Sequence, residues 1–309
     1  MAYLEGKAVV VTGAGRGLGR AYAHLASREG ASVVVNDIDA DVAEAVTEEI
    51  ARDGGKAVTA VADVSDWAGA ESIIDRCVAE FGAIHGLVNN AGLFSMADGW
   101  ELDQAHVDEL VRTNVIGVMA CGTFALRRMV PQGFGSIVNI TSGAHFGIPH
   151  MSVYGATKGA VASLTYTWSM EAASSGVRVN AVSPLARTRM GESTAEFYRR
   201  HNLGTIDSSA SPDPEVNAPV VVFLLSDASS AINGQIVRIE GQHLAVVAHP
   251  AVREPVLQGE WTVAAIDEVF RDTLGRYTVP VGVAPLLRAE YLSGASAFWD
   301  GRADEEARK

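Results

Sequence analysis

The chain has 309 residues, of which 48% are hydrophobic and 20% are charged, and its formal net charge is −13. This composition supports a folded core, and the negative charge argues against a nucleic-acid partner, because nucleic-acid binding proteins present basic surfaces. The first residues contain no basic segment followed by an apolar one, so no signal peptide is expected. No apolar run reaches about 18 residues, so no membrane span is expected either.

The two cysteines, Cys77 and Cys121, lie far apart in helical contexts. This placement favours buried free thiols in a reducing compartment over a disulfide or a metal site. The sequence therefore predicts a cytoplasmic protein without a bound metal.

The first predicted elements are a strand over residues 7–11 and, after a glycine-rich turn, a helix that runs to Glu29. The turn reads Gly13-Ala14-Gly15-Arg16-Gly17-Leu18-Gly19. Glycines at a strand–helix junction let the backbone approach a phosphate, and the helix N-terminus adds N–H donors. The spacing is not the G-x-G-x-x-G pattern, but its position after a strand and before a helix predicts dinucleotide binding.

The second predicted strand, over residues 31–35, leads to Asp37, which lies 18 residues past Gly19. A carboxylate at this position accepts hydrogen bonds from the ribose hydroxyls of an adenosine and repels a 2′-phosphate, which favours NAD over NADP. Arg16 argues the other way, since a guanidinium in the glycine turn could hold that phosphate. We give Asp37 more weight, because a carboxylate facing a phosphate costs more than an unused exposed arginine.

The third predicted strand, over residues 56–61, is followed by Asp63 and Val64, which are candidate cofactor contacts. Asp63 could contact the adenine amino group. Alternatively, Ser65 or Asp66 simply caps the next helix.

The fourth predicted strand, over residues 84–88, ends in a turn that contains Asn90, Ala91 and Gly92. This composition suits a tight turn over the cofactor, and a turn without a ligand is the alternative. The long helical region that follows contains Asn114 among valines, which helix propensity does not explain. Asn114 either forms hydrogen bonds inside the core or holds a water molecule.

The fifth predicted strand ends before Thr141 and Ser142, and the chain then returns to a helix that carries Tyr154 and Lys158. These two residues are four positions apart, so they lie on one helix face, one turn from each other. A cation beside a phenol favours the phenolate, so we expect the pKa of Tyr154 to be lowered. Tyr154 is therefore a candidate proton donor and acceptor, although the pair alone also fits an ordinary helix surface.

Strands over residues 177–182 and 235–240 complete a regular alternation of strands and helices. This order predicts an α/β fold: a Rossmann-type, doubly wound, seven-stranded parallel sheet that forms a single domain over residues 1–245. Ligands bind such sheets at the carboxyl ends of the strands, where most of the candidate residues lie.

Two further segments lie outside this alternation. Residues 187–211 follow a strand end and show weak periodicity, which predicts a mobile lid over the substrate. Residues 246–309 are predicted to be an extension that packs on the core or on a neighbouring subunit, with one helix near residues 263–274.

Together these motifs resemble the short-chain dehydrogenase/reductase family over residues 5–242. The matching residues, in chain order, are Thr12-Gly13-x-x-x-Gly17-x-Gly19, Asn89-Asn90-Ala91-Gly92, Asn114, Ser142 and Tyr154-x-x-x-Lys158. The resemblance implies an oxidoreductase that interconverts a secondary alcohol and a ketone by hydride transfer with NAD(P).

The resemblance also implies a catalytic tetrad. In it, Ser142 hydrogen-bonds the substrate oxygen, Tyr154 exchanges its proton, and Asn114 positions a water in the proton relay. Lys158 lowers the pKa of the tyrosine and binds the nicotinamide ribose. The gap from Ser142 to Tyr154 is one residue short of the commonest spacing; Thr141 would fit the longer gap, but Ser142 matches the motif better.

Further cofactor contacts are implied at Pro184 and Thr188, where the chain departs from the Pro-Gly that is usual in the family. Family members are commonly homo-oligomers, which implies a dimer or a tetramer here. Three segments, GAGRGLGRAYA, VVVND and PLARTRM, and the extension with Trp261-Thr262 resemble the dehydrogenase part of peroxisomal multifunctional enzyme type 2.

This narrower resemblance implies a 3-hydroxyacyl-CoA or hydroxysteroid substrate. The candidates for a local CoA-phosphate patch are Arg187, Arg189, Arg199 and Arg200. Two alternatives stay open: an NADP-dependent 3-oxoacyl thioester reductase, and a non-catalytic dinucleotide-binding sensor.

Overall fold

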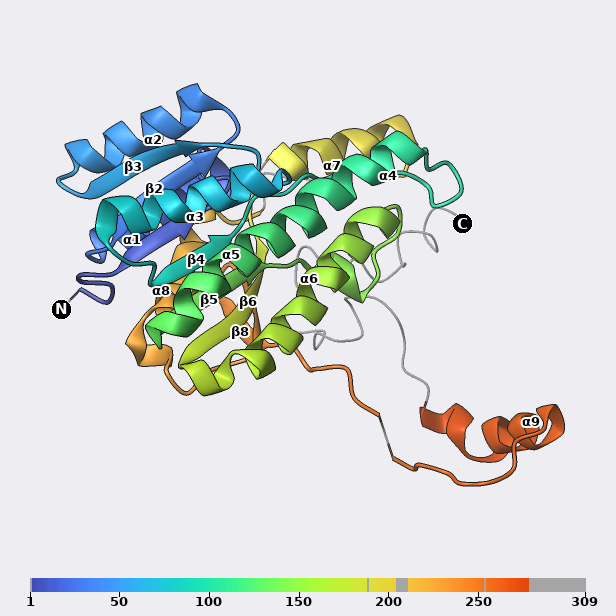
Figure 1. Cartoon of the computed structure of the whole chain (residues 1–309). Coiled ribbons are helices and arrows are strands. Elements are labelled where there is room, and N and C mark those ends of the chain that lie inside the picture. Colours follow the sequence, from blue (N-terminus) through green and yellow to red (C-terminus); the bar gives the residue numbers. More distant parts are fainter. Residues whose placement is uncertain (1, 188, 204–210, 253, 278–309) are drawn as a thin grey trace.

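The computed structural model describes residues 2–187, 189–203, 211–252 and 254–277, which form one sheet with helices on both of its faces (Figure 1). The predicted Rossmann-type α/β fold is confirmed. Within the described residues, the core and the cavity both belong to this single layered unit.

The sheet has eight strands in the order β3-β2-β1-β4-β5-β6-β7-β8. The seven predicted strands pair in parallel. The chain order reverses between β1 and β4, so the turns that follow these two strands meet at the carboxyl edge of the sheet. The strands are β1 (Ala8–Val11), β2 (Ser32–Asp37), β3 (Lys56–Val61), β4 (Gly86–Asn89), β5 (Gly135–Ile140), β6 (Val177–Leu185), β7 (Ile236–Glu240) and β8 (His243–Val246).

The eighth strand is a correction to the predicted seven. β8 runs antiparallel to β7, and Gly241 takes a φ of 58° in the two-residue turn between them. Because all four residues of β8 are exposed, the strand lacks the buried apolar pattern by which the other seven were predicted.

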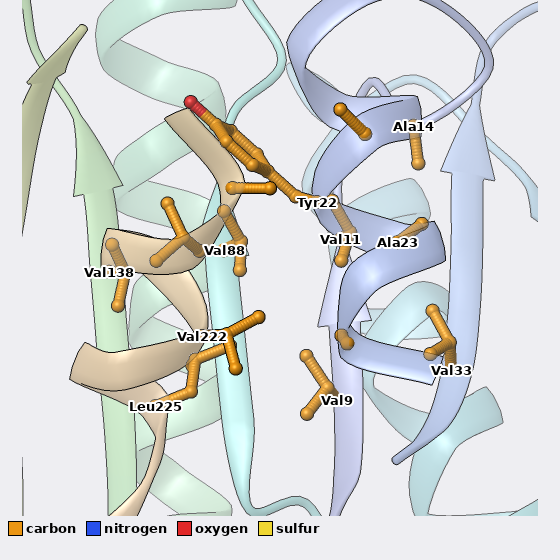
Figure 2. Close-up of a cluster of buried hydrophobic side chains, with 14 of the residues drawn as sticks. Val9, Val11, Ala14, Tyr22, Ala23, Val33, Val88, Val138, Val222 and Leu225 are labelled. Carbon is orange, nitrogen blue, oxygen red and sulfur yellow. The ribbon is translucent and has the colours of Figure 1, made fainter. Parts of the chain in front are cut away.

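The helices divide between the two faces of the sheet. α1 (Gly17–Arg28), α2 (Ala40–Arg52) and α8 (Ala218–Leu225) pack on one face, and α3 (Trp67–Phe81), α5 (Gly117–Gln132) and α6 (Ser152–Glu171) pack on the other. Figure 2 shows the first of these layers, where Tyr22 of α1 and Val222 of α8 cover Val9 and Val88 of the central strands. Burial of β-branched residues on both faces explains why these strands read as continuous apolar runs.

The long helix predicted around Asn114 is interrupted. α4 (Gln104–Val111) and α5 are joined by one turn of π-helix over Arg112–Ile116, and Asn114 lies inside this turn. Such turns interrupt the regular hydrogen-bond ladder of a helix and are frequent at functional sites. Propensity gives no signal for this irregularity.

The predicted lid contains more regular structure than its sequence indicates. Residues Arg189–Arg200 form the helix α7, and residues 204–210 of the predicted lid lie outside the described residues. Tyr198 and Thr194 of α7 are each only 8% exposed. Burial of these two side chains shows that α7 packs against the body of the protein.

Among the described residues, one helical segment, Gln104–Gln132, is long and apolar enough to cross a membrane, but half of its apolar 18-residue window is buried inside the protein. This burial is typical of a core helix. Cys77 and Cys121 are free and buried, as predicted, and burial raises the pKa of each thiol to about 12. Such thiols are unreactive.

The extension contains the predicted helix, α9 (Val263–Asp272), but α9 has no buried residue. In Figure 1 it stands away from the sheet at the end of an extended segment. Residues 278–309 of the extension lie outside the described residues. Packing on a neighbouring subunit stays a prediction.

Candidate active site

A cavity of about 210 Å³ lies at the carboxyl edge of the sheet. Its walls come from the turn after β4, the ends of β5 and β6, the first turns of α6, and α7. Ser142, Tyr154 and Lys158 all line this one cavity, so the structure brings together three of the four predicted catalytic residues. Asn114 does not line it.

The Ser142 side chain lies beside the Tyr154 hydroxyl and acts to lower its pKa. Ser142 caps the short 3-10 helix that follows β5, where its Oγ accepts a hydrogen bond from the Ala144 N–H at 3.2 Å. Tyr154 lies in the first turn of α6, and its ring packs edge-on against Phe94 with 5.0 Å between the ring centroids. Both side chains are thus held by their own local structure in the wall of the same cavity.

The pKa of Tyr154 is raised, so the expectation that it is lowered is wrong. Burial raises the pKa of Tyr154 to about 12, and the Ser142 side chain offsets this effect only in part. The Lys158 ammonium lies 5.8 Å from the centroid of the Tyr154 ring and donates its hydrogen bond to the Ile140 carbonyl at 2.8 Å. Loss of solvent therefore outweighs the attraction of the cation.

Lys158 is itself unusual, because its side chain is charged and almost completely buried. The residue is 4% exposed, and burial lowers the pKa of its ammonium from 10.5 to about 8. Near neutral pH the ammonium is thus still protonated, but it holds its proton weakly. Such a perturbed group in a cavity marks a functional-site candidate.

Asn114 connects two segments that border the cavity. Its Oδ1 accepts from the Leu93 N–H at 2.7 Å, and its Nδ2 donates to the Leu93 carbonyl at 2.8 Å and to Thr157 Oγ1 at 3.1 Å. Thr157 in turn donates to the Tyr154 carbonyl at 2.8 Å. Of the two alternatives for Asn114, the structure shows the hydrogen bonds inside the core. They hold the first turns of α6 against the loop that follows Gly92.

The glycine turn after β1 packs closely against the turn after β4 and is hydrogen-bonded to it. Asn90 Nδ2 donates to the carbonyls of Thr12 and Gly13 at 2.9 and 3.0 Å. A Cβ at Gly13 would lie 2.8 Å from Ala91 Cα, and one at Gly19 would lie 2.2 Å from the Gly13 carbonyl oxygen. Glycine is required at both positions by close packing of backbone on backbone.

The N-terminus of α1 is open. Its N-cap residue, Arg16, makes no capping hydrogen bond, and the first turn contains no acidic residue. The first N–H groups of this helix, from Gly17, Leu18 and Gly19, are therefore available to a phosphate, and the helix dipole favours negative charge there. These residues fit the dinucleotide that the sequence predicts.

Asp37 supports the glycine turn from the end of β2. Its Oδ2 accepts from the Gly15 N–H at 3.0 Å, and its Oδ1 accepts from the Asp39 N–H at 3.2 Å. The exposed Arg16 side chain pairs through its Nη2 with Asp39 Oδ2 at 2.9 Å. Two carboxylates thus lie where the adenosine ribose is expected.

The other predicted cofactor contacts are less distinctive. Asp63 is exposed and accepts from the Ser65 N–H at 2.8 Å, while Asp66 caps α3 through the Gly69 N–H at 2.9 Å. The local-turn alternative for Asp63 therefore fits, and an adenine contact stays a prediction. Val64 is buried in the core layer that contains α5.

Pro184 lies in β6 and lines the cavity together with Asn90 and Gly92. The next residues, Leu185 and Ala186, also line it, so the loop that departs from the expected Pro-Gly still borders the cavity. Thr188 lies outside the described residues, as does its predicted contact.

Comparison with protein families matches residues 7–198 to the family described as short chain dehydrogenase. The chain belongs to this family. The 3-oxoacyl-[acyl-carrier-protein] reductase FabG of Thermotoga maritima is 35% identical over 240 residues, which cover 77% of this chain and 98% of that protein.

Solved structures of short-chain dehydrogenases show the same fold. A short chain dehydrogenase from Mycobacterium avium matches with a TM-score of 0.77 and 31% identity over 88% of this chain and 96% of that one. NAD⁺-bound xylitol dehydrogenase matches with a TM-score of 0.72 and 28% identity over 77% and 99% of the two chains. A gluconate 5-dehydrogenase from Burkholderia cenocepacia in complex with NADP and tartrate matches with a TM-score of 0.68 and 30% identity over 77% and 95%.

The rest of the cavity of this short-chain dehydrogenase was not predicted from the sequence. Phe94, Ile148 and Met151 form an apolar wall, and Met190 and Thr194 close it from the side of α7. Arg238 of β7 lies in the wall as well. Only Arg238 carried a usable signal in the sequence, because it is a charged residue within the mostly buried strand IVRIE.

Three of the four arginines predicted to form a local basic patch are engaged in ion pairs. Arg187 pairs with Asp213, and Arg199 and Arg200 both pair with Glu196. Exposed pairs of this kind contribute little energy, so a stronger anion could still displace them. As the structure stands, these arginines do not form an open basic surface.

Proposed function

We propose that this short-chain dehydrogenase is an NAD-dependent oxidoreductase that interconverts a secondary alcohol and a ketone, with Ser142, Tyr154 and Lys158 as its catalytic residues. The observation that carries the proposal is that the interacting side chains of Ser142 and Tyr154 and the buried Lys158 all line one largely apolar cavity. An enzyme that transfers hydride needs such a cavity to exclude water from the reacting carbon.

The nicotinamide nucleotide, when bound, supplies the acceptor or donor of the hydride. The Ser142 hydroxyl binds and orients the oxygen of the substrate. Tyr154 donates its hydroxyl proton to that oxygen when a ketone is reduced, and takes a proton from it when an alcohol is oxidised. Because its pKa is raised to about 12, Tyr154 is protonated at neutral pH and ready for the reductive direction.

Lys158 lies next to the tyrosine, where its positive charge stabilises the phenolate that forms as Tyr154 gives up its proton. Its nearest hydrogen-bond acceptor is the Ile140 carbonyl at the end of β5. We assign Asn114 a positioning role, because its hydrogen bonds fix the first turn of α6, on which Tyr154 lies.

The preference for NAD is supported by the two carboxylates at the end of β2. A 2′-phosphate would face both Asp37 and Asp39, and Arg16 is already paired with Asp39. The test is calorimetric titration with NAD⁺, NADH, NADP⁺ and NADPH. Wild-type protein should prefer the NAD forms, and Asp37→Asn should narrow the difference while keeping an acceptor for the Gly15 N–H.

A preference of the wild-type protein for NADP would overturn this assignment and favour the NADP-dependent 3-oxoacyl thioester reductase. Two observations bear on the substrate. FabG of Thermotoga maritima is named as a reductase of 3-oxoacyl thioesters, and the apolar cavity would accept an acyl chain. Oxidation of 3-hydroxyacyl-CoA thioesters and hydroxysteroids with NAD is therefore the first assay, followed by other secondary alcohols.

A non-catalytic sensor would bind NAD but leave its absorbance unchanged with every alcohol and ketone. We also propose a homo-oligomer, a dimer or a tetramer, in the cytoplasm. Size-exclusion chromatography with light scattering measures the oligomeric state directly, and a monomer would contradict this part of the proposal.

A further inference from the structure

One cation in the wall of the cavity has no part in the chemistry described above. Arg238 comes from β7, and it lines the same cavity as Ser142 and Tyr154. Among the described residues that line the cavity, Lys158 and Arg238 are the charged ones. The side chain of Arg238 is only 11% exposed, so the guanidinium is largely removed from solvent.

The guanidinium is held in place by hydrogen bonds, but these bonds do not engage all of its N–H donors. Its Nη1 donates to Ser183 Oγ at 3.2 Å, and its Nη2 donates to Glu240 Oε2 at 3.0 Å. Each terminal nitrogen therefore keeps a second N–H group. The Nε atom is buried and has no hydrogen-bond partner among the described residues.

Unused donors in a buried position are unfavourable, and proteins satisfy nearly all of them. Because Arg238 lines the cavity, a ligand can supply an acceptor to the remaining N–H groups of its terminal nitrogens. Glu240 balances the charge of Arg238, so a ligand would meet hydrogen-bond donors rather than a strong net positive charge. This arrangement suits an acceptor oxygen.

Arg238 also lies close to the loop that carries Ser142. His145 of that loop has its pKa lowered by burial, and the charge of Arg238 adds to the lowering. The parallel register pairs Arg238 with Ser183, one residue before Pro184 in the cavity wall. A group that touches Arg238 and a carbon that reacts near Tyr154 could thus belong to one small molecule.

We propose that Arg238 is a specificity-determining residue that binds a second oxygen function of the substrate, a carbonyl or a carboxylate, at a distance from the reacting carbon. The proposal rests on the alcohol–ketone oxidoreduction proposed above. The substrate is then a hydroxy or oxo compound with two oxygen groups, and a simple alkanol is a poorer substrate.

The probes are 4-oxopentanoate, 5-oxohexanoate and 6-oxoheptanoate, together with their methyl esters and the parent 2-alkanones. The principal variant is Arg238→Met combined with Glu240→Gln, so that no buried carboxylate is left unpaired. Glu240→Gln alone is the matched control, because it keeps the guanidinium. For each protein the ratio of kcat/KM for the oxo acid or ester to that for its parent ketone is measured with NADH.

The double variant should lower this ratio by about 10- to 100-fold, mainly through KM, because a hydrogen bond to a charged donor is lost. Glu240→Gln should raise the ratio for the oxo acids and leave it unchanged for the esters if the natural ligand group is a carboxylate. If Glu240→Gln leaves the ratio high and similar for the oxo acids and for the esters, the ligand group is a carbonyl. A ratio that the double variant leaves unchanged would overturn the proposal, as would an equal loss for ketones and oxo acids.

A second measurement does not depend on turnover. In the Tyr154→Phe background, calorimetry gives the affinity of the protein–NADH complex for each oxo compound and its parent ketone. Arg238→Met/Glu240→Gln should weaken the oxo compounds and not the ketones. If wild-type protein turns over no probe but this difference in affinity is present, the proposed oxidoreduction fails and the binding role of Arg238 stands; if the difference is absent, the role of Arg238 fails.

Discussion

Lys158→Met should remove activity and at the same time stabilise the protein near neutral pH. In the folded state the pKa of Lys158 is lowered from 10.5 to about 8 by burial. At pH 7 the ammonium is charged in both the folded and the unfolded state. The folded state therefore bears the full free-energy cost of burying the charge, which the shift of the pKa measures. With about 1.4 kcal/mol for each unit of pKa, this cost amounts to about 3 kcal/mol.

The pH dependence gives the sharper test of this value. Between the folded pKa and the unfolded pKa, the unfolded chain binds more protons, so the stability of the wild-type protein rises with pH in that window. At pH 10 only about 1 kcal/mol of this cost remains. Loss of the bond from Lys158 to the Ile140 carbonyl subtracts about 1–2 kcal/mol from the gain of the variant, by a similar amount at pH 7 and pH 10.

Urea unfolding of both proteins at pH 7 and pH 10, without nucleotide, measures the change. The advantage of Lys158→Met should shrink by about 2 kcal/mol between the two pH values. Lys56→Met, at an exposed position, is the control for any general effect of removing a lysine. If the stability advantage of Lys158→Met over the wild-type protein stays constant or grows from pH 7 to pH 10, burial of the charged Lys158 does not destabilise the folded protein, and the reasoning is refuted.

Three further predictions follow from other parts of the molecule. Tyr22→Phe should leave the free energy of unfolding unchanged or raise it by about 1 kcal/mol in urea titrations, because the buried Tyr22 hydroxyl has no hydrogen-bond partner among the described residues; a loss of more than about 1 kcal/mol would reveal a missing partner. Gly19→Ala should abolish NAD binding in calorimetry, since its Cβ would lie 2.2 Å from the Gly13 carbonyl oxygen, and unchanged affinity would contradict the close packing of the glycine turn. His150→Ala should raise KM by about fivefold with a smaller effect on kcat, because His150 bonds Asp98 at 2.7 Å and contacts Phe197 of α7; an unchanged KM would show that α7 is held without it.

Much of the fold was predictable because its signals are local. The strands that fill the sheet are short β-branched runs, such as Ala8–Val11, that are buried on both faces and end in glycine or asparagine turns. Each signal lies within a few residues and repeats along the chain. β8 escaped prediction because it is wholly exposed, whereas the equally short β1 and β4 are fully buried.

The candidate catalytic residues were also predictable, but their electrostatics were not. The spacing of Tyr154 and Lys158 fixes the shared helix face, whereas their pKa values depend on how deeply the loop after β5 and the segment around Phe94 bury them. Burial of this kind is a property of tertiary packing. The sequence indicated the electrostatic attraction between Tyr154 and Lys158, but it did not indicate that burial has the larger effect on their pKa values.

The walls of the cavity were the least predictable part. Phe94, Met151 and Met190 come from three segments far apart in the chain, and each reads locally as an ordinary apolar residue. Their convergence follows from the strand order and from the position of α7. Arg238 shows the opposite case, since a charge in a buried strand is visible in the sequence but its partners are not.

The central claim is that Tyr154 exchanges a proton with the oxygen of a secondary alcohol or ketone while the nucleotide exchanges hydride. Wild-type protein and Tyr154→Phe should be compared for NADH-dependent reduction across a panel of ketones and thioesters, with NADH affinity measured in parallel by calorimetry. The account predicts that Tyr154→Phe loses turnover by at least about 1,000-fold and keeps its affinity for NADH within a few-fold. Turnover retained in Tyr154→Phe would contradict the account at its centre.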